Sequence, residues 1–113
     1  MAKSNPFHEY VMNEVFYEID GVISRPMFGG FGIYKDGLFF ALISDDALYF
    51  KVDESNRKDF KKLGSKQFTY TTLNGKVTRI NYWELPEKII DDREELVKWV
   101  EKSVEVAQKA KKK

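Results

Sequence analysis

Hydrophobic and polar positions repeat along the chain with two periods, and these periods predict its secondary structure. Apolar residues recur at steps of three and four over residues 5–20, which predicts an amphipathic helix. Asn5 can cap this helix, Pro6 can occupy its first turn, and Gly21 is a natural stop. The same steps predict a final helix capped by Asp92, with a core-facing stripe of Leu96, Trp99, Val100, Ser103, Val104 and Ala107.

Strand-like runs fill the middle of the chain, at residues 29–35, 38–44 and 47–52. Asp36-Gly37 separates the first two runs, and Asp-Gly is a strong signal for a two-residue hairpin turn. Asp45-Asp46 favours a turn between the second and third runs. Residues 38–44 are apolar on both faces, which predicts a central strand. A short surface helix is predicted over residues 53–63, capped by Asp53 or Ser55.

A second hairpin is predicted over residues 66–85, with Asn74-Gly75 as its turn. If those two residues form the loop, Thr72 lies opposite Val77 and Tyr70 lies opposite Arg79. Neither face of this hairpin is cleanly apolar, so the alternation does not select that register.

The predicted order of elements is α-βββ-α-ββ-α, with the strands in meanders and hairpins. This order indicates an α+β fold with an antiparallel sheet. The length of 113 residues suits one domain spanning residues 1–113, and residues 107–113 read as a frayed basic tail.

Composition excludes several classes of protein. The net charge of +1 is too balanced to indicate a nucleic-acid or membrane partner by itself. The chain has no cysteine, which excludes disulfides and thiolate chemistry and suits a reducing cytosol. No run approaches the roughly 20 apolar residues that span a bilayer. We therefore expect a cytoplasmic protein without a membrane segment.

Three glycines lie within four positions, Gly29, Gly30 and Gly32, between aromatic residues. Dinucleotide and P-loop motifs need a helix after the glycines and different spacing, and here a strand follows. The G-x-x-G clamp of one RNA-binding module lies between helices, which this segment does not. The favoured interpretation is a bulge or a close backbone approach at the start of an edge strand.

Catalytic and metal-binding patterns are weak. His8 is the only histidine and has no second histidine or cysteine with which to hold a metal. No nucleophile motif accompanies it, and the paired aspartates are explained by turns and caps. We therefore expect no catalytic residue, no metal, no cofactor and no enzymatic activity. Glu84, beside Trp83, is the one acid whose burial would change that expectation.

Basic residues cluster locally and offer a second interpretation. The candidates for phosphate contact are Arg57, Lys58, Lys61, Lys62 and Lys66, with the lysines at the end of the chain. Acids at positions 53, 54 and 59 partly neutralise this cluster, and solvated helix faces have the same composition.

Ordered motifs give the chain a family resemblance. The run Met27 to Tyr34 and the run Leu48 to Asp53 resemble two motifs of the N-terminal domain of the TfoX (Sxy) family, whose members regulate natural competence. Further matches are Phe60, Gly64, Phe68 and Tyr70, and then Tyr82, Pro86, Leu96 and Trp99. The resemblance implies a five-stranded antiparallel sheet with helices, similar to secretion-chaperone-like domains. It makes Gly29, Gly30, Gly32 and Tyr34 a structural signature.

The resemblance also implies a function. It favours a regulatory domain that acts on transcription through a protein partner, with a homodimer as one arrangement. Arg25, Met27 and Phe28 are the expected partner contacts, because side chains rather than glycines confer specificity. Two alternatives stay open. One is direct nucleic-acid binding by the basic cluster, and the other is a small-molecule pocket lined by Phe28, Phe31 and Tyr34.

Overall fold

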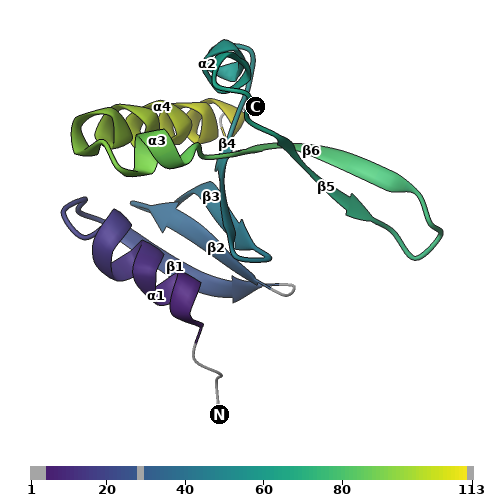
Figure 1. Cartoon of the computed structure of the whole chain (residues 1–113), viewed down its shortest axis with the longest axis horizontal. Helices are drawn as coiled ribbons and strands as arrows, with labels where there is room; N and C mark the ends of the chain where they lie inside the picture. The colour runs from purple at the N-terminus through teal and green to yellow at the C-terminus, as the bar shows by residue number, and fades with distance from the viewer. Residues whose placement is uncertain (1–4, 28–29, 112–113) are drawn as a thin grey trace.

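The computed structural model describes residues 5–27 and 30–111, in which a six-stranded sheet carries a layer of helices (Figure 1). The elements in chain order are α1 (Pro6–Tyr10), the π-helix η1 (Val11–Val15), β1 (Val22–Met27), β2 (Gly30–Lys35), β3 (Leu38–Ser44), β4 (Ala47–Lys51), α2 (Arg57–Lys62), β5 (Gln67–Thr71), β6 (Val77–Glu84), α3 (Glu87–Ile90) and α4 (Arg93–Lys111). The expected α+β class with an antiparallel sheet is confirmed.

The sheet has six strands in the order β1-β2-β3-β4-β6-β5, so the expectation of five strands is wrong. The additional strand is β1, which pairs antiparallel with β2 from Val22–Lys35 to Met27–Gly30. Pro26 lies within β1, and proline disfavours a strand assignment from sequence. An edge strand tolerates proline, and β1 is the edge here. The glycine-rich strand β2 is consequently an interior strand, which corrects its expected edge position.

One hydrophobic core lies between the sheet and the helices. Phe40 of β3 packs edge-to-face against Phe16 and Phe50, with ring centroids 5.8 Å and 5.5 Å away. The register of β2 against β3 shifts beside Ile33, so that Phe40 and Ala41 are both buried although they are neighbours in the chain. This bulge and the central position of β3 explain why residues 38–44 are apolar on both faces.

The N-terminal helix is shorter and more irregular than the spacing predicts. The Asn5 side chain accepts a hydrogen bond of 3.0 Å from the His8 amide, which confirms the predicted cap. After Tyr10 the helix widens to π geometry, and the Phe16 amide donates to the Val11 carbonyl at 2.9 Å. Turns follow as far as Gly21, which has a left-handed φ of 79°.

The C-terminal part differs from expectation by one additional helix, α3, which the predicted order of elements does not contain, and by the end of α4. The short helix α3 precedes the predicted cap Asp92, whose carboxylate accepts a hydrogen bond of 3.2 Å from the Glu95 amide. Helix α4 contacts β3 and β4 and continues to Lys111, through most of the segment that the sequence predicts as a frayed tail.

Both predicted turns between the central strands are present. Asp36 and Gly37 have φ values of 50° and 84°, and Asp45 and Asp46 have φ values of 49° and 59°. Positive φ at both central residues is the geometry of the hairpin turn whose twist matches that of the strands. The two turns therefore hold β2, β3 and β4 in a tight meander.

The register predicted for β5 and β6 is wrong by one residue. Thr71, not Thr72, lies opposite Val77. The Thr72 amide donates to the Lys76 carbonyl at 2.8 Å, and Gly75 is left-handed with φ 81°. The loop is therefore three residues long, and its last residue is the glycine that such a loop requires.

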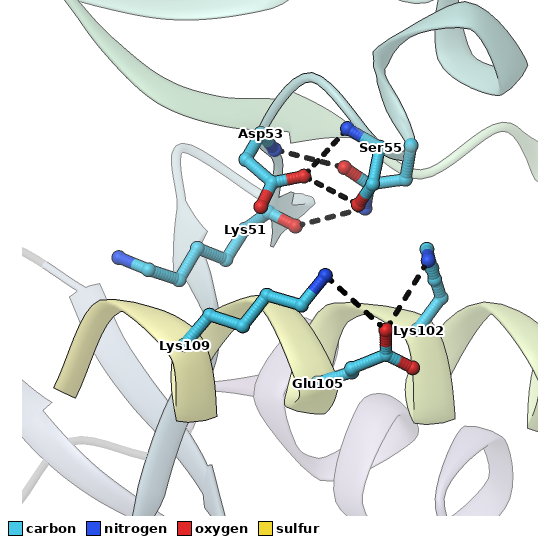
Figure 2. A network of polar contacts seen from close by, with 7 residues as sticks. Lys51, Asp53, Ser55, Lys102, Glu105 and Lys109 are labelled. Carbon is cyan, nitrogen blue, oxygen red and sulfur yellow. Dashed lines mark hydrogen bonds and ion pairs between the residues drawn. The ribbon is translucent and has the colours of Figure 1, made fainter. Parts of the chain in front are cut away.

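The loop before α2 is held by hydrogen bonds from its own side chains. Asp53 accepts hydrogen bonds from the amide and hydroxyl of Ser55, as Figure 2 shows. The buried Asn56 side chain accepts from the Asp53 amide at 2.8 Å and donates to the Lys51 carbonyl at 3.2 Å. The N-cap of α2 is Asn56, so the predicted caps Asp53 and Ser55 are wrong, and the predicted bounds of 53–63 contract to Arg57–Lys62.

Candidate protein-interaction surface

The two faces of the sheet carry different environments. On one face, every second side chain of a strand points toward α1, η1 and α4. These side chains, which include Ile33, Phe50 and Trp83, form the core. Their neighbours in each strand point to the other face, here called the open face, which carries Tyr34, Phe39, Leu42, Tyr49 and Tyr82. An antiparallel sheet with helices on one side commonly leaves such a face for solvent or a partner.

A row of aromatic rings crosses the open face. The ring of Phe39 lies 5.1 Å from that of Tyr34 and 5.5 Å from that of Tyr82. A cation lies over each end of the row, with the Arg25 guanidinium 5.5 Å from Tyr34 and the Lys51 ammonium 5.0 Å from Tyr82. Burial and the neighbouring Tyr34 raise the pKa of Tyr82, and burial lowers the pKa of Lys51. The row is therefore a packed, neutral platform with a basic group at each end.

An apolar concavity lies beside this row. It is lined by Met27, Leu42, Phe68, Tyr70 and Ile80, with the last residues of β3, and its volume is about 460 Å³. The side chains come from β1, β3, β5 and β6, which are distant in sequence. Phe68 is fixed at the rim by edge-to-face contact with Tyr49 at 4.9 Å. A concavity of this size lined by Met and aromatic residues has the composition of the core of a protein interface.

The hairpin of β5 and β6 extends away from the helical layer (Figure 1). Large apolar residues are exposed along it, with Tyr70 at 46%, Val77 at 62% and Leu73 at 107%. Residues 64–83 include the basic residues Lys66, Lys76 and Arg79 and no acid. This β5–β6 hairpin, here called the arm, is therefore both apolar and basic. Exposed apolar side chains gathered in this way indicate a surface that a partner covers.

Two of the three expected partner contacts, Arg25 and Met27, lie on the open face. Met27 lines the concavity, and Arg25 lies over Tyr34. Phe28 lies outside the described residues, as does Gly29. Whether Arg25, Met27 and Phe28 contact a partner stays a prediction.

The remaining glycines of the signature allow close approach of neighbouring groups. A Cβ atom on Gly30 would lie 2.0 Å from the Ile43 carbonyl oxygen. A Cβ atom on Gly32 would lie 3.0 Å from the Met27 sulfur and 3.1 Å from the Phe39 ring. Neither glycine is among those with left-handed φ. Close approach, not backbone strain, therefore accounts for these two glycines.

Phe31 and Tyr34, the two described residues of the predicted small-molecule pocket, do not lie together. Phe31 faces the helices and stacks on the His8 ring, with centroids 3.7 Å apart. Tyr34 lies on the open face against Phe39. They are three positions apart along one strand, so they occupy opposite faces and cannot line one pocket.

The predicted phosphate contacts lie at another end of the molecule. Arg57, Lys58, Lys61 and Lys62 belong to α2, and Lys66 follows it. A cavity of about 510 Å³ between α2 and α4 includes Lys62, Lys98 and Lys102 among its lining residues, together with the acids Asp59, Asp92 and Glu95. Opposite charges therefore alternate there, and phosphate contact stays a prediction.

Ionisable groups near α4 form a local network rather than a catalytic arrangement. Lys102 and Lys109 lie 3.4 Å and 3.5 Å from the same oxygen of Glu105 (Figure 2), and they lower the pKa of Glu105. Although burial raises the pKa of Asp53, the hydrogen bonds from Ser55 and the charges of Lys109 and Lys102 bring it below its ordinary value. No cluster of three potential metal ligands occurs in residues 5–27 and 30–111. The expectation of a non-enzymatic protein stays a prediction.

Sequence reasoning missed the concavity and the exposed tip of the hairpin. The concavity needs β1, which proline concealed, and the bulge beside β5 that brings Phe68 against Tyr49. Residues 22–27 gave no clear signal for β1, because the face of Ile23, Arg25 and Met27 mixes apolar and charged side chains.

Comparison with known proteins places these features in a family. No helix in the described part of the chain is long and apolar enough to cross a membrane. Among curated proteins, no sequence matches the chain. The family model of the TfoX N-terminal domain matches residues 14–107, a range that extends from η1 to the last turns of α4 and includes all six strands. The chain therefore belongs to the TfoX N-terminal domain family.

Proposed function

We propose that this chain is a non-enzymatic protein-interaction domain that regulates transcription by binding a protein partner through its open face. The observation that carries the proposal is the apolar concavity lined by Met27, Leu42, Phe68, Tyr70 and Ile80. Binding sites are typically concave and mostly apolar, and an apolar lining gains free energy when a partner covers it.

The residues around the concavity support a protein rather than a small molecule as its occupant. Aromatic residues, Met and Arg are enriched at the cores of protein interfaces. The surface offers Met27, Tyr70 and Arg25, whereas the concavity holds no cluster of ionisable groups that would orient a small substrate.

The family supports the regulatory part of the proposal. The chain belongs to the TfoX N-terminal domain family, and its motifs resemble those of regulators of competence. We also propose a cytoplasmic location, which the absence of cysteine supports. Within this proposal the partner is a component of the transcription machinery.

The test is affinity capture from a lysate of the native host, with identification of the proteins retained. The wild-type chain and a Tyr17→Asp control are expected to retain the same transcription component, because Tyr17 is 74% exposed outside the open face. Tyr70→Asp is expected to lose that component, because it places a charge at the rim of the concavity. Retention of no transcription component by the wild-type chain would contradict the proposal, as would equal retention by Tyr70→Asp.

A further inference from the structure

We infer that the occupant of the apolar concavity is the β5–β6 hairpin of a second copy of this chain. The inference rests on the proposed function only in taking the open face as a protein-binding surface. It adds a second occupant and a reciprocal geometry, in which each copy inserts its arm into the concavity of the other while no transcription component occupies it.

The arm and the concavity are complementary in polarity. Leu73 at the tip is fully exposed, and Val77 beside it is 62% exposed. Tyr70 pairs with Thr78 and Thr71 pairs with Val77, so Tyr70 and Val77 lie on opposite faces of the hairpin. The exposed apolar side chains near the tip that a partner would cover are therefore Leu73 and Val77. The concavity presents Met27, Leu42 and Ile80 as an apolar lining, so it can bury these side chains without leaving a polar group unpaired.

The charges around the two surfaces are also complementary. The arm carries Lys76 and Arg79 near its tip and no acid over residues 64–83. The concavity includes the end of β3 at Ser44, which is followed by the acidic turn Asp45-Asp46. Arm against arm would bring like charges together, whereas arm against concavity brings the basic tip to the acidic rim.

The position of Tyr70 makes the exchange reciprocal. Tyr70 belongs to the arm and also lines the concavity, so the two surfaces adjoin on one molecule. Leu73 lies three positions after Tyr70, a span of up to about 10 Å in extended chain. Two arms that cross near Tyr70 can therefore each reach the concavity of the other copy. A two-fold arrangement of this kind closes on itself as a dimer.

The first experiment measures the mass of the chain in solution by sedimentation over a range of concentrations. The wild-type chain and the Tyr17→Asp control are expected to form the same dimer. Leu73→Asp is expected to raise the dissociation constant by about tenfold or more, because it places a carboxylate in an apolar site beside an acidic rim. Leu73 contacts nothing that the fold needs, and an unchanged circular dichroism spectrum verifies that the variant is folded.

The second experiment separates this arrangement from any other dimer. Met27→Asp alters only the concavity, and Leu73→Asp alters only the arm. Each variant alone loses both reciprocal contacts. A mixture of the two variants keeps one intact contact, formed by the arm of the Met27→Asp chain and the concavity of the Leu73→Asp chain. The mixture is therefore expected to form heterodimers at concentrations at which each variant alone is monomeric.

Several outcomes would overturn the inference, and they differ from failure of the proposed function. A wild-type chain that stays monomeric, a dimer that resists Leu73→Asp, or a mixture that does not recover would each exclude the exchange of arms. If Met27→Asp abolishes capture of a transcription component while the wild-type chain is a monomer, the open face binds a different protein and only the inference fails. If neither capture nor mass responds to Met27→Asp, both fail.

Discussion

The Nε2 atom of His8 lies 2.7 Å from the hydroxyl oxygen of Ser24, so a side chain of α1 is hydrogen-bonded to strand β1. The same imidazole stacks on Phe31 of β2. His8 therefore connects the first helix both to the edge strand β1 and to its neighbour β2.

This contact predicts a dependence of stability on pH. Burial lowers the pKa of His8 below 6.5, and the charge of Glu9 offsets part of this effect. The folded state therefore favours the neutral ring, so the stability from His8 is complete above the unfolded pKa and is lost as the pH falls below it. We expect the melting temperature to fall between about pH 7 and pH 5 by more in the wild-type chain than in His8→Gln. An identical pH dependence in both chains would contradict this role of His8.

The glycines of β2 predict unequal effects of the same substitution. Gly30→Ala brings Cβ against the Ile43 backbone, which cannot move without breaking the sheet, and we expect it to cost about 1–3 kcal/mol. Gly32→Ala is expected to cost less, because its nearest contact is the end of the flexible Met27 side chain. Urea denaturation of both variants measures the difference. Equal losses, or none, would mean that close approach does not explain these glycines.

Asn56 predicts a loss of stability from a substitution that barely changes shape. Asn56→Asp replaces the amide that donates to the Lys51 carbonyl and places a charge in a buried site. We expect a loss of about 1–3 kcal/mol from the unpaired carbonyl and the buried charge. Asn13→Asp, on the exposed side of η1, is the matched control and should have little effect. Thermal unfolding compares the two variants, and equal behaviour would contradict the role of Asn56.

Ser103 predicts a substitution that stabilises the fold. It lies fully buried in α4, and its hydroxyl has no hydrogen-bond partner within the described part of the chain. Ser103→Ala removes that hydroxyl and should raise the free energy of unfolding by about 1 kcal/mol. A loss of stability in chemical denaturation would show that the hydroxyl is hydrogen-bonded in solution.

Direct binding to nucleic acid makes a prediction that the protein-interaction function does not. If Lys58, Lys61 and Lys62 contact phosphates, the affinity for duplex DNA should fall steeply with salt, and each Lys→Glu substitution should reduce the slope. We expect no such binding, because Lys62 shares the lining of the cavity between α2 and α4 with the acids Asp59, Asp92 and Glu95. Salt-dependent binding that these substitutions weaken would favour the alternative.

Local signals in the sequence predicted the parts of the fold that depend on neighbouring residues. The caps at Asn5 and Asp92 and the turns at Asp36-Gly37 and Asp45-Asp46 are all present. Each depends on side-chain or backbone preferences within a few residues, which a sequence displays directly.

The features that the sequence did not predict depend on pairing between distant residues. Proline obscured β1, which forms because the edge of β2 is available to it. The register of β5 and β6 changed with a third loop residue, Leu73, which propensity alone does not assign. The concavity combines both effects, because it needs Met27 from β1 and Phe68 from β5 on one surface.

Pro26 has a consequence for assembly beyond its effect on prediction. A sheet whose two outer strands can both accept another strand can grow without limit into fibrils. Here β1 and β5 are the outer strands, and β1 contains a residue that has no amide hydrogen to donate. Strand-by-strand growth is therefore hindered at one side of the molecule, which favours finite assemblies over aggregation.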